Sequence, residues 1–153
     1  MQPQSSDPLT HCSALAPNGY LEMSDMILPP TSDDGTLKPT SYLARMSEMS
    51  VEAAARLGRR LDLAPQYAAM LQAAGFVDIT VKRFKWPSNV WPGDKKHKDL
   101  GRWNFINMSG GLEGLTMAMF TQALGLSRQE TEALCAGARG ELNDVRIHAY
   151  STL

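Results

Sequence analysis

Two side chains near the C-terminus have the types and the spacing of an acid–base pair. His148 and Tyr150 stand two positions apart, and side chains two apart in a strand project from the same face. An imidazole exchanges a proton near neutral pH, and a phenol donates a hydrogen bond to a carbonyl oxygen that gains negative charge. We predict that His148 and Tyr150 are catalytic; the alternative is a partly buried histidine with a structural role only.

The segment from 100 to 124 concentrates aromatic and methionine side chains. Such side chains usually form the core, but an adaptable apolar face also suits a subunit interface or a pocket for a hydrophobic small molecule. A mostly carbon substrate requires an apolar wall with a few polar groups beside it. The predicted substrate-binding residues are therefore Arg102, Trp103, Asn107, Met108, Glu113, Met117 and Phe120.

The sequence lacks the common motifs for metals and nucleotides. His11, His97 and His148 are scattered, and no Cys-x-x-Cys or His-Glu-x-x-His spacing occurs. No Gly-x-Gly-x-x-Gly or Gly-x-x-x-x-Gly-Lys-Ser/Thr motif occurs either. The glycines between 110 and 114 lie between helical segments, which favours helix flexure or close helix packing. We expect no metal site and no phosphate cradle.

Composition narrows the function classes. The chain has 153 residues, 43% of them hydrophobic and 20% charged, which is typical of one soluble globular domain. Its net charge of −1 argues against a nucleic-acid partner. The basic stretch 82–102, with Trp86 and Trp91 interleaved, is better read as a solvated loop than as a surface for an anionic partner.

Localisation signals are also missing from the sequence. No apolar run approaches the roughly 20 residues that span a bilayer, and the first residues do not form a secretory signal. Cys12 and Cys135 are too few for a disulfide scaffold, which favours free thiols in a reducing compartment. We therefore expect a cytoplasmic protein without a membrane span.

The pattern along the chain predicts a short arm and one domain. Residues 1–18 are polar and aperiodic, so we expect a flexible arm before a single domain at 19–153. Apolar and β-branched runs predict strands at 20–28, which Pro29-Pro30 should end, and at 76–84. The C-terminal stretch 146–153 could begin one more strand.

Apolar residues at helical spacing predict most of the remaining structure. Helices are expected from 41 to 53, from 65 to 74 and over 100–124, where Gly110-Gly111 should interrupt the helix after a loop at 86–99. Ser127-Arg128-Gln129-Glu130 is a capping box that should open a last helix to about residue 139. Two parallel strands cannot cover their own edges, so we expect completion by a second chain, most simply in a homodimer.

The short motifs together resemble one enzyme family, the LaeA-like fungal methyltransferases of secondary metabolism. These proteins belong to the class I methyltransferases that use S-adenosylmethionine. The resemblance covers residues 18–150 and corresponds to the C-terminal half of the family. Its motifs are Asn18-Gly19-Tyr20-Leu21-Glu22-Met23-Ser24-Asp25, Ser32-Asp33-Asp34-Gly35-Thr36, Ala74-Gly75-Phe76-Val77-Asp78, Asn89-Val90-Trp91-Pro92, Leu100-Gly101, Gly114-Leu115, Leu124-Gly125-Leu126-Ser127 and Arg146-Ile147-His148-Ala149-Tyr150.

The departures from the family matter for the expected chemistry. The resemblance implies that the segment 18–25 corresponds to the fifth strand of the family sheet and the segment 74–78 to the sixth. The glycine-rich loop and the acidic residue that bind the cofactor precede the fifth strand in the family, and the final strand follows His148-Ala149-Tyr150. We therefore expect an α/β remnant of the class I fold, mostly helical with about two core strands, without S-adenosylmethionine as a cofactor.

Two functions stay open on this basis. In the first, the chain is a small enzyme of a fungal biosynthetic pathway that does not methylate. It would act as a cyclase, isomerase or pericyclase on a hydrophobic intermediate. In the second, it is a non-catalytic partner subunit of a full-length methyltransferase, so that its partner is either a second copy or that enzyme.

Overall fold

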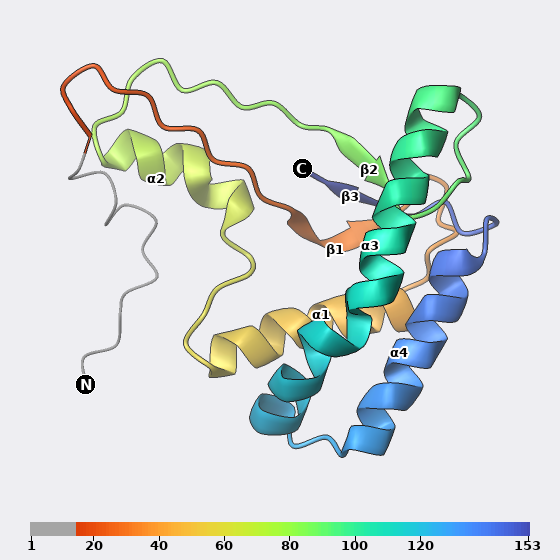
Figure 1. Ribbon diagram of the computed structural model, residues 1–153. Helices are drawn as coiled ribbons and strands as arrows, with labels where there is room; N and C mark the ends of the chain where they lie inside the picture. The colour runs from red at the N-terminus through yellow and green to blue at the C-terminus, as the bar shows by residue number, and fades with distance from the viewer. Residues whose placement is uncertain (1–14) are drawn as a thin grey trace.

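Three short strands form the only sheet in the part of the chain that the structure describes. The computed structural model describes residues 15–153 (Figure 1). The strands are β1 (Ile27–Thr31), β2 (Lys85–Pro87) and β3 (Tyr150–Thr152), in the order β1-β3-β2. Both neighbours pair antiparallel to β3, with Thr31 opposite Tyr150 and Lys85 opposite Thr152. The C-terminal strand is therefore central, and β1 and β2 are edges.

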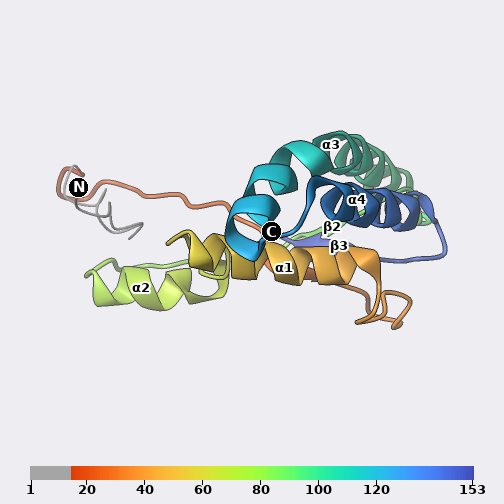
Figure 2. The same cartoon turned by 90° about the horizontal axis from the view of Figure 1, so that it is seen from below.

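Helices make up most of the body and enclose its core. They are α1 (Tyr42–Arg56), α2 (Tyr67–Ala73) after a 3₁₀ turn at Ala64–Gln66, α3 (Lys95–Met119), a π-helical turn at Phe120–Leu124, and α4 (Arg128–Asn143). Figure 2 shows α1 on one side of the strands and α3 and α4 on the other. The fully buried side chains Leu112, Phe120, Cys135 and Leu142 come from α3, the π-helical turn and α4.

The structure confirms the helices that the sequence predicts. α1 begins directly after Ser41, and α2 lies within the predicted second helix. The Ser127 side chain accepts a hydrogen bond from the Glu130 amide, and the Glu130 carboxylate accepts one from the Ser127 amide, so the capping box is present. α4 runs four residues past the predicted end at 139, to Asn143.

The first predicted strand is wrong in position. Residues 20–26 belong to no strand, and β1 contains Pro29 and Pro30, the residues expected to end it. Proline has no N–H to donate to a sheet, but an edge strand needs donors on one side only. Because β1 is an edge, it tolerates both prolines.

The second predicted strand is wrong as well. Residues 76–84 are extended without belonging to a strand, and only Phe84 exchanges backbone hydrogen bonds with Leu153, at 2.8 and 2.9 Å. β2 then starts at Lys85 and enters the predicted loop 86–99. β-branched residues favour a strand only where a neighbour supplies hydrogen-bond partners. The described sheet is also antiparallel, not parallel as expected.

The long helix differs from its prediction at its start and at Gly110-Gly111. α3 begins at Lys95, inside the predicted loop, because the Asp94 side chain accepts a hydrogen bond from the His97 amide. It continues without a break through Gly110-Gly111, and the irregularity falls at the π-helical turn instead. Glycine weakens a helix by about 1 kcal/mol, which packing along α3 offsets.

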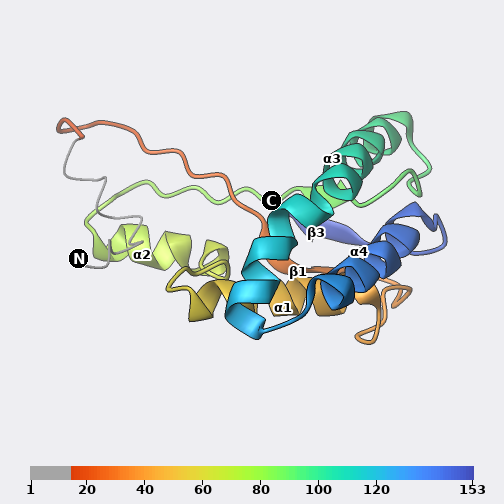
Figure 3. The same cartoon turned by 60° about the horizontal axis from the view of Figure 1, so that its bottom comes forward.

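Two extended segments and α2 stand away from the packed body. Residues 15–26 and 76–84 run out beside α2 (Figure 3). Several of their apolar side chains are open to solvent, with Tyr20 97% and Val77 81% exposed, whereas Phe76 and Ile79 are half-buried. Of the predicted arm, residues 1–14 lie outside the described residues, and 15–18 are exposed.

Candidate functional site

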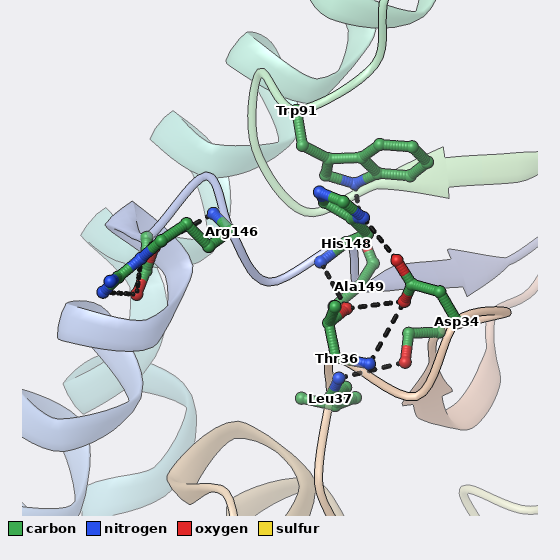
Figure 4. A network of polar contacts seen from close by, with 9 residues as sticks. Asp34, Thr36, Leu37, Trp91, Arg146, His148 and Ala149 are labelled. Atoms are coloured by element: carbon green, nitrogen blue, oxygen red, sulfur yellow. Dashed lines mark hydrogen bonds and ion pairs between the residues drawn. The ribbon is translucent and has the colours of Figure 1, made fainter.

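A tight loop between β1 and α1 contains two adjacent carboxylates, Asp33 and Asp34. Asp34 Oδ1 accepts hydrogen bonds from the Thr36 amide at 3.1 Å and from the Thr36 hydroxyl at 2.8 Å. The Ser32 hydroxyl accepts a hydrogen bond from the Leu37 amide at 3.0 Å, which closes the loop (Figure 4). Gly35 lies inside the turn with a φ of +70°, a left-handed conformation that glycine adopts without strain. The loop therefore fixes Asp34 before any distant residue is involved.

His148 is held on this loop from three directions. Its Nδ1 lies 2.5 Å from Asp34 Oδ2, and its backbone N–H donates to the Thr36 hydroxyl at 2.8 Å. The ring lies beside the Trp91 indole, with 5.1 Å between the centroids. The Trp91 Nε1–H donates to the Ala149 carbonyl at 3.0 Å (Figure 4). Among the described residues nothing bonds His148 Nε2, so this nitrogen can accept a proton.

Tyr150 contacts the neighbouring carboxylate. Its hydroxyl donates to Asp33 Oδ1 at 2.6 Å, while Lys85 Nζ lies 2.5 Å from Asp33 Oδ2. The Lys85 ammonium also lies 4.4 Å from the centroid of the Tyr150 ring, a cation–π distance. The Tyr150 side chain is buried, and its hydroxyl proton is already donated to the Asp33 carboxylate in a hydrogen bond.

These contacts fix the charges of the loop at neutral pH. The Thr36 hydroxyl and amide, with His148, lower the pKa of Asp34 to about 2. The ammonium of Lys85 and the hydroxyl of Tyr150 lower the pKa of Asp33. The Asp33 carboxylate in turn raises the pKa of Tyr150. Both aspartates are therefore ionised and Tyr150 is protonated at neutral pH.

The predicted substrate-binding residues do not form one wall. Phe120 is fully buried in the core, whereas Trp103 and Asn107 point outward and are exposed. Arg102 pairs with Asp99 at 3.6 Å, and Glu113 pairs with Arg139 of α4 at 2.7 Å. Met108 and Met117 are half-buried. In the described structure none of the seven shares a hydrogen bond with His148 or Tyr150.

Four residues of the site were not predicted as site residues. Asp33 and Asp34 stand in the predicted polar loop, and Lys85 and Trp91 stand in the predicted basic stretch. The Asp-x-Thr spacing is a local turn signal, since a short carboxylate readily accepts from the amide two positions on. Their approach to His148 and Tyr150 depends on chain segments more than 50 residues apart, and no local pattern reports it.

A separate hollow lies on the extended part of the molecule. It is lined by residues 18–25 and 76–84, with Ile27, Tyr67, Leu71 and Leu153 among the rest. The Tyr67 hydroxyl donates to Asp25 Oδ2 at 2.6 Å, which raises the pKa of Tyr67 to about 12. None of the nine predicted site residues lines this hollow.

Other kinds of site find little support in the described residues. No group of three or more His, Cys, Asp or Glu side chains there is arranged to hold a metal ion. None of the helices in residues 15–153 has the length and apolar character for a membrane crossing.

Comparison with known proteins identifies the class. The chain is 33% identical over 138 residues to the probable methyltransferase tdiE of Emericella nidulans, which covers 90% of the chain and 44% of tdiE. It is 38% identical over 135 residues to the methyltransferase pytC of Aspergillus terreus, covering 88% and 42% of the two proteins. No family model matches the chain, and no solved structure matches it significantly. The chain is thus methyltransferase-like.

A third relative makes the family more specific. Secondary metabolism regulator LAE1 of Cochliobolus heterostrophus is 34% identical over 136 residues, covering 88% of the chain and 44% of LAE1. The chain belongs to the LaeA-like fungal methyltransferases, as the sequence motifs indicate. It spans less than half the length of the curated relatives it matches.

The described residues do not by themselves fit the cofactor of this class. S-adenosylmethionine requires a glycine-rich strand-to-helix turn and a carboxylate free to bind a ribose. The loops after β1 and β2 each have one glycine and at least one carboxylate. After β1, Asp33 is bonded to Tyr150 and Lys85, and Asp34 to Thr36 and His148. After β2, Asp94 is bonded to His97.

Proposed function

We propose that this chain is a non-catalytic partner that joins the cofactor-binding region of a LaeA-like methyltransferase. The observation that carries the proposal is the pair of segments 18–26 and 76–84, which belong to no strand and expose the apolar side chains of Tyr20, Val77, Val81 and Phe84. Extended backbone without a neighbour leaves N–H and C=O groups that another strand can pair with. The relatives are more than twice as long as the matched region, which leaves room for such a neighbour.

The side chains of these segments support the same partner. Tyr20, Val77, Val81 and Phe84 are between 55% and 97% exposed. Full burial of one such side chain contributes about 1.5–3 kcal/mol. A sheet from the cofactor-binding region would cover several of them at once, and the hollow along 18–25 and 76–84 would lie at the junction.

The test is co-expression of the chain with the part of pytC that it does not cover. We expect the two polypeptides to co-purify, and titration calorimetry with S-adenosylmethionine to give saturable heat for the complex but not for the chain alone. Replacing Val77→Lys together with Val81→Lys should weaken association at least tenfold. Val145→Lys is the matched control, because Val145 is 50% exposed on a different segment. Saturable cofactor binding by the chain alone, or unchanged association of the double variant, would contradict the proposal.

A second candidate function is a cofactor-independent enzyme acting on a hydrophobic intermediate. The observation that favours it is the His148–Asp34 pair, because a carboxylate at Nδ1 orients the ring and leaves Nε2 to accept a proton. In an isomerisation, Nε2 would remove a proton from a carbon beside a carbonyl and return it to another carbon. Positioning the substrate can lower the activation barrier of a cyclisation or pericyclic step by several kcal/mol, up to about 10. Tyr150 would support Asp33 in this scheme.

Purified protein assayed alone with the pathway intermediate separates the two functions. If the enzyme reading holds, His148→Ala loses turnover at least a hundredfold, while Tyr150→Phe keeps most of it because Lys85 still holds Asp33. Circular dichroism of both variants checks folding first. A well-folded His148→Ala variant with an unchanged rate would exclude this chemistry.

A further inference from the structure

At one end of the sheet, the chain on both sides of the central strand runs on past it. Ile27 of β1 and Lys85 of β2 lie opposite the same residue of β3. Because β1 and β2 are antiparallel to β3, the segments that precede them, 18–26 and 76–84, continue beyond Leu153. Figure 1 shows both of them passing the chain end marked C. Both segments and Leu153 line the hollow described above, so the hollow lies in line with β3.

The hydrogen bonds at Leu153 indicate which backbone groups face the hollow. The Phe84 N–H donates to the Leu153 carbonyl at 2.8 Å, and the Leu153 N–H donates to the Phe84 carbonyl at 2.9 Å. In an antiparallel ladder, such a pair recurs at every second residue. None of residues 79–84 has a positive φ, so we expect the alternation to continue along them. Lys82 then directs its N–H and C=O toward the hollow, and Arg83 directs them away.

A hollow between two such segments suits one strand. A single strand placed there would pair with a neighbour on each side, whereas a strand on either outer edge would pair on one side only. It would run in the direction of β3, antiparallel to both neighbours. Tyr67 and Leu71 of α2 line the hollow and are half-buried, as is Ile79. Because side chains of a strand alternate between its faces, every second one would need to be apolar to contact these residues.

We propose that the hollow takes one extended strand of the cofactor-binding polypeptide, inserted between segments 18–26 and 76–84 in line with β3. This inference rests on the proposed partner function and adds the form of the contact, which is strand addition with alternating apolar side chains. Main-chain hydrogen bonds to both segments supply affinity, and the apolar floor formed by α2 selects the side chains. The inserted strand continues the ladder that begins at the Phe84–Leu153 pair.

Two neighbouring basic residues provide a matched test of the hydrogen bonding. Lys82→Pro removes an N–H that faces the hollow, and Arg83→Pro removes one that faces away. Both side chains are exposed, and each substitution removes one positive charge. With the part of pytC that the chain does not cover, we expect Lys82→Pro to weaken association at least tenfold and Arg83→Pro less than threefold. Circular dichroism checks the fold of both variants first, and equal weakening by the two would overturn the insertion.

Photo-cross-linking tests the position of the strand. A benzophenone side chain placed at Glu22 and, separately, at Val81 should label one and the same short stretch of the pytC polypeptide, because the strand lies between the two positions. The same probe at Val145, on a different segment, should not label that stretch. Labels on two separate stretches of a co-purifying partner would overturn the insertion and leave the partner function standing. Labels within the chain itself or on a second copy would assign the hollow to another occupant, and failure to co-purify would overturn the partner function as well.

Discussion

At the scale of single residues, the loop Ser32–Thr36 connects the first and last strands through side chains. Asp33 and Asp34 are neighbours in the chain, yet each holds a side chain more than 110 residues away, Tyr150 and His148 respectively. Both carboxylates are well exposed, so their contacts with Lys85 and His148 stabilise the fold only modestly. Their larger effect is orientation, because they set where the His148 ring points.

The low pKa of Asp34 predicts an acid-dependent contribution to stability. Its pKa is about 2 in the folded protein against a usual 3.8. A lowered pKa stabilises the fold above pH 4, and this contribution is lost as the pH falls from about 4 to 2. Asp34→Asn should therefore lower the melting temperature at pH 7, and its difference from the wild type should close by pH 2.

Thermal unfolding followed by circular dichroism at pH 7, 4 and 2 checks this prediction. Glu48→Gln is the control, since Glu48 is an exposed residue of α1 without a hydrogen bond among the described residues. A gap between Asp34→Asn and the wild type that stays constant from pH 7 to pH 2 would count against the role of Asp34.

Gly101 is required by a close approach of the backbone. A Cβ at this position would lie 1.9 Å from the Asn89 carbonyl oxygen, and Asn89 is itself buried. Gly101→Ala should cost about 1–3 kcal/mol or more, as overpacking does. Gly140→Ala, in open space on α4, should instead stabilise by up to about 1 kcal/mol. Urea denaturation of both variants measures the opposite signs; a neutral Gly101→Ala would contradict the contact.

At the scale of the elements, the helices are capped in different ways. Asp94 caps α3 and the Ser127–Glu130 box caps α4, both from local sequence. α1 has no cap bond from its own Ser41. Its first amides, on Tyr42 and Leu43, donate instead to the Glu141 carboxylate of α4 at 2.9 and 2.7 Å. The start of α1 therefore depends on the position of α4.

Removing this tertiary cap should destabilise the protein more than removing a surface ion pair. Glu141→Ala leaves two amides of α1 without their acceptor, and we expect a loss of about 1–3 kcal/mol. Glu132→Ala, which removes only the exposed pair with Arg128, should cost about 0.5 kcal/mol or less. Denaturant titration compares the two; equal losses would show that Glu141 does not cap α1.

At the scale of the whole molecule, the packed body and the extended part differ in how they are held. α1, α3 and α4 share one buried core, whereas α2 has no buried residue. Segment 76–84 contributes few backbone hydrogen bonds, the pair with Leu153 among them. Regions with few buried contacts open at low free-energy cost.

Limited proteolysis should report this difference. We expect trypsin to cut first after Lys82 or Arg83, which are exposed in the extended segment, and later after Arg139, which lies within α4 and pairs with Glu113. Mass spectrometry of early fragments identifies the sites. Protection of residues 82–83 on adding the cofactor-binding region would support the proposed partner. First cleavage within α4 would contradict the lower stability of the extended part.

The sequence by itself determined the helices, because their signals are local. The apolar spacing of 41–53 and the Ser127–Glu130 box act within one or two turns, and both elements are where the pattern predicts them. The strands at 20–28 and 76–84 were predicted wrongly, since a strand forms only where a distant segment offers a partner. That partner is β3 at the chain end, and no local pattern reports which segment it pairs with.

The candidate site, too, is only partly predictable from local sequence. The two-residue spacing of His148 and Tyr150 is visible in the sequence, and the structure places both side chains against one loop. Which carboxylate each one meets, and that Trp91 lies beside His148, depends on how β1, β3 and the start of α3 come together. The outward turn of Trp103 and the burial of Phe120 were likewise decided by tertiary packing, because one helix must present one face to the core and the other to its surroundings.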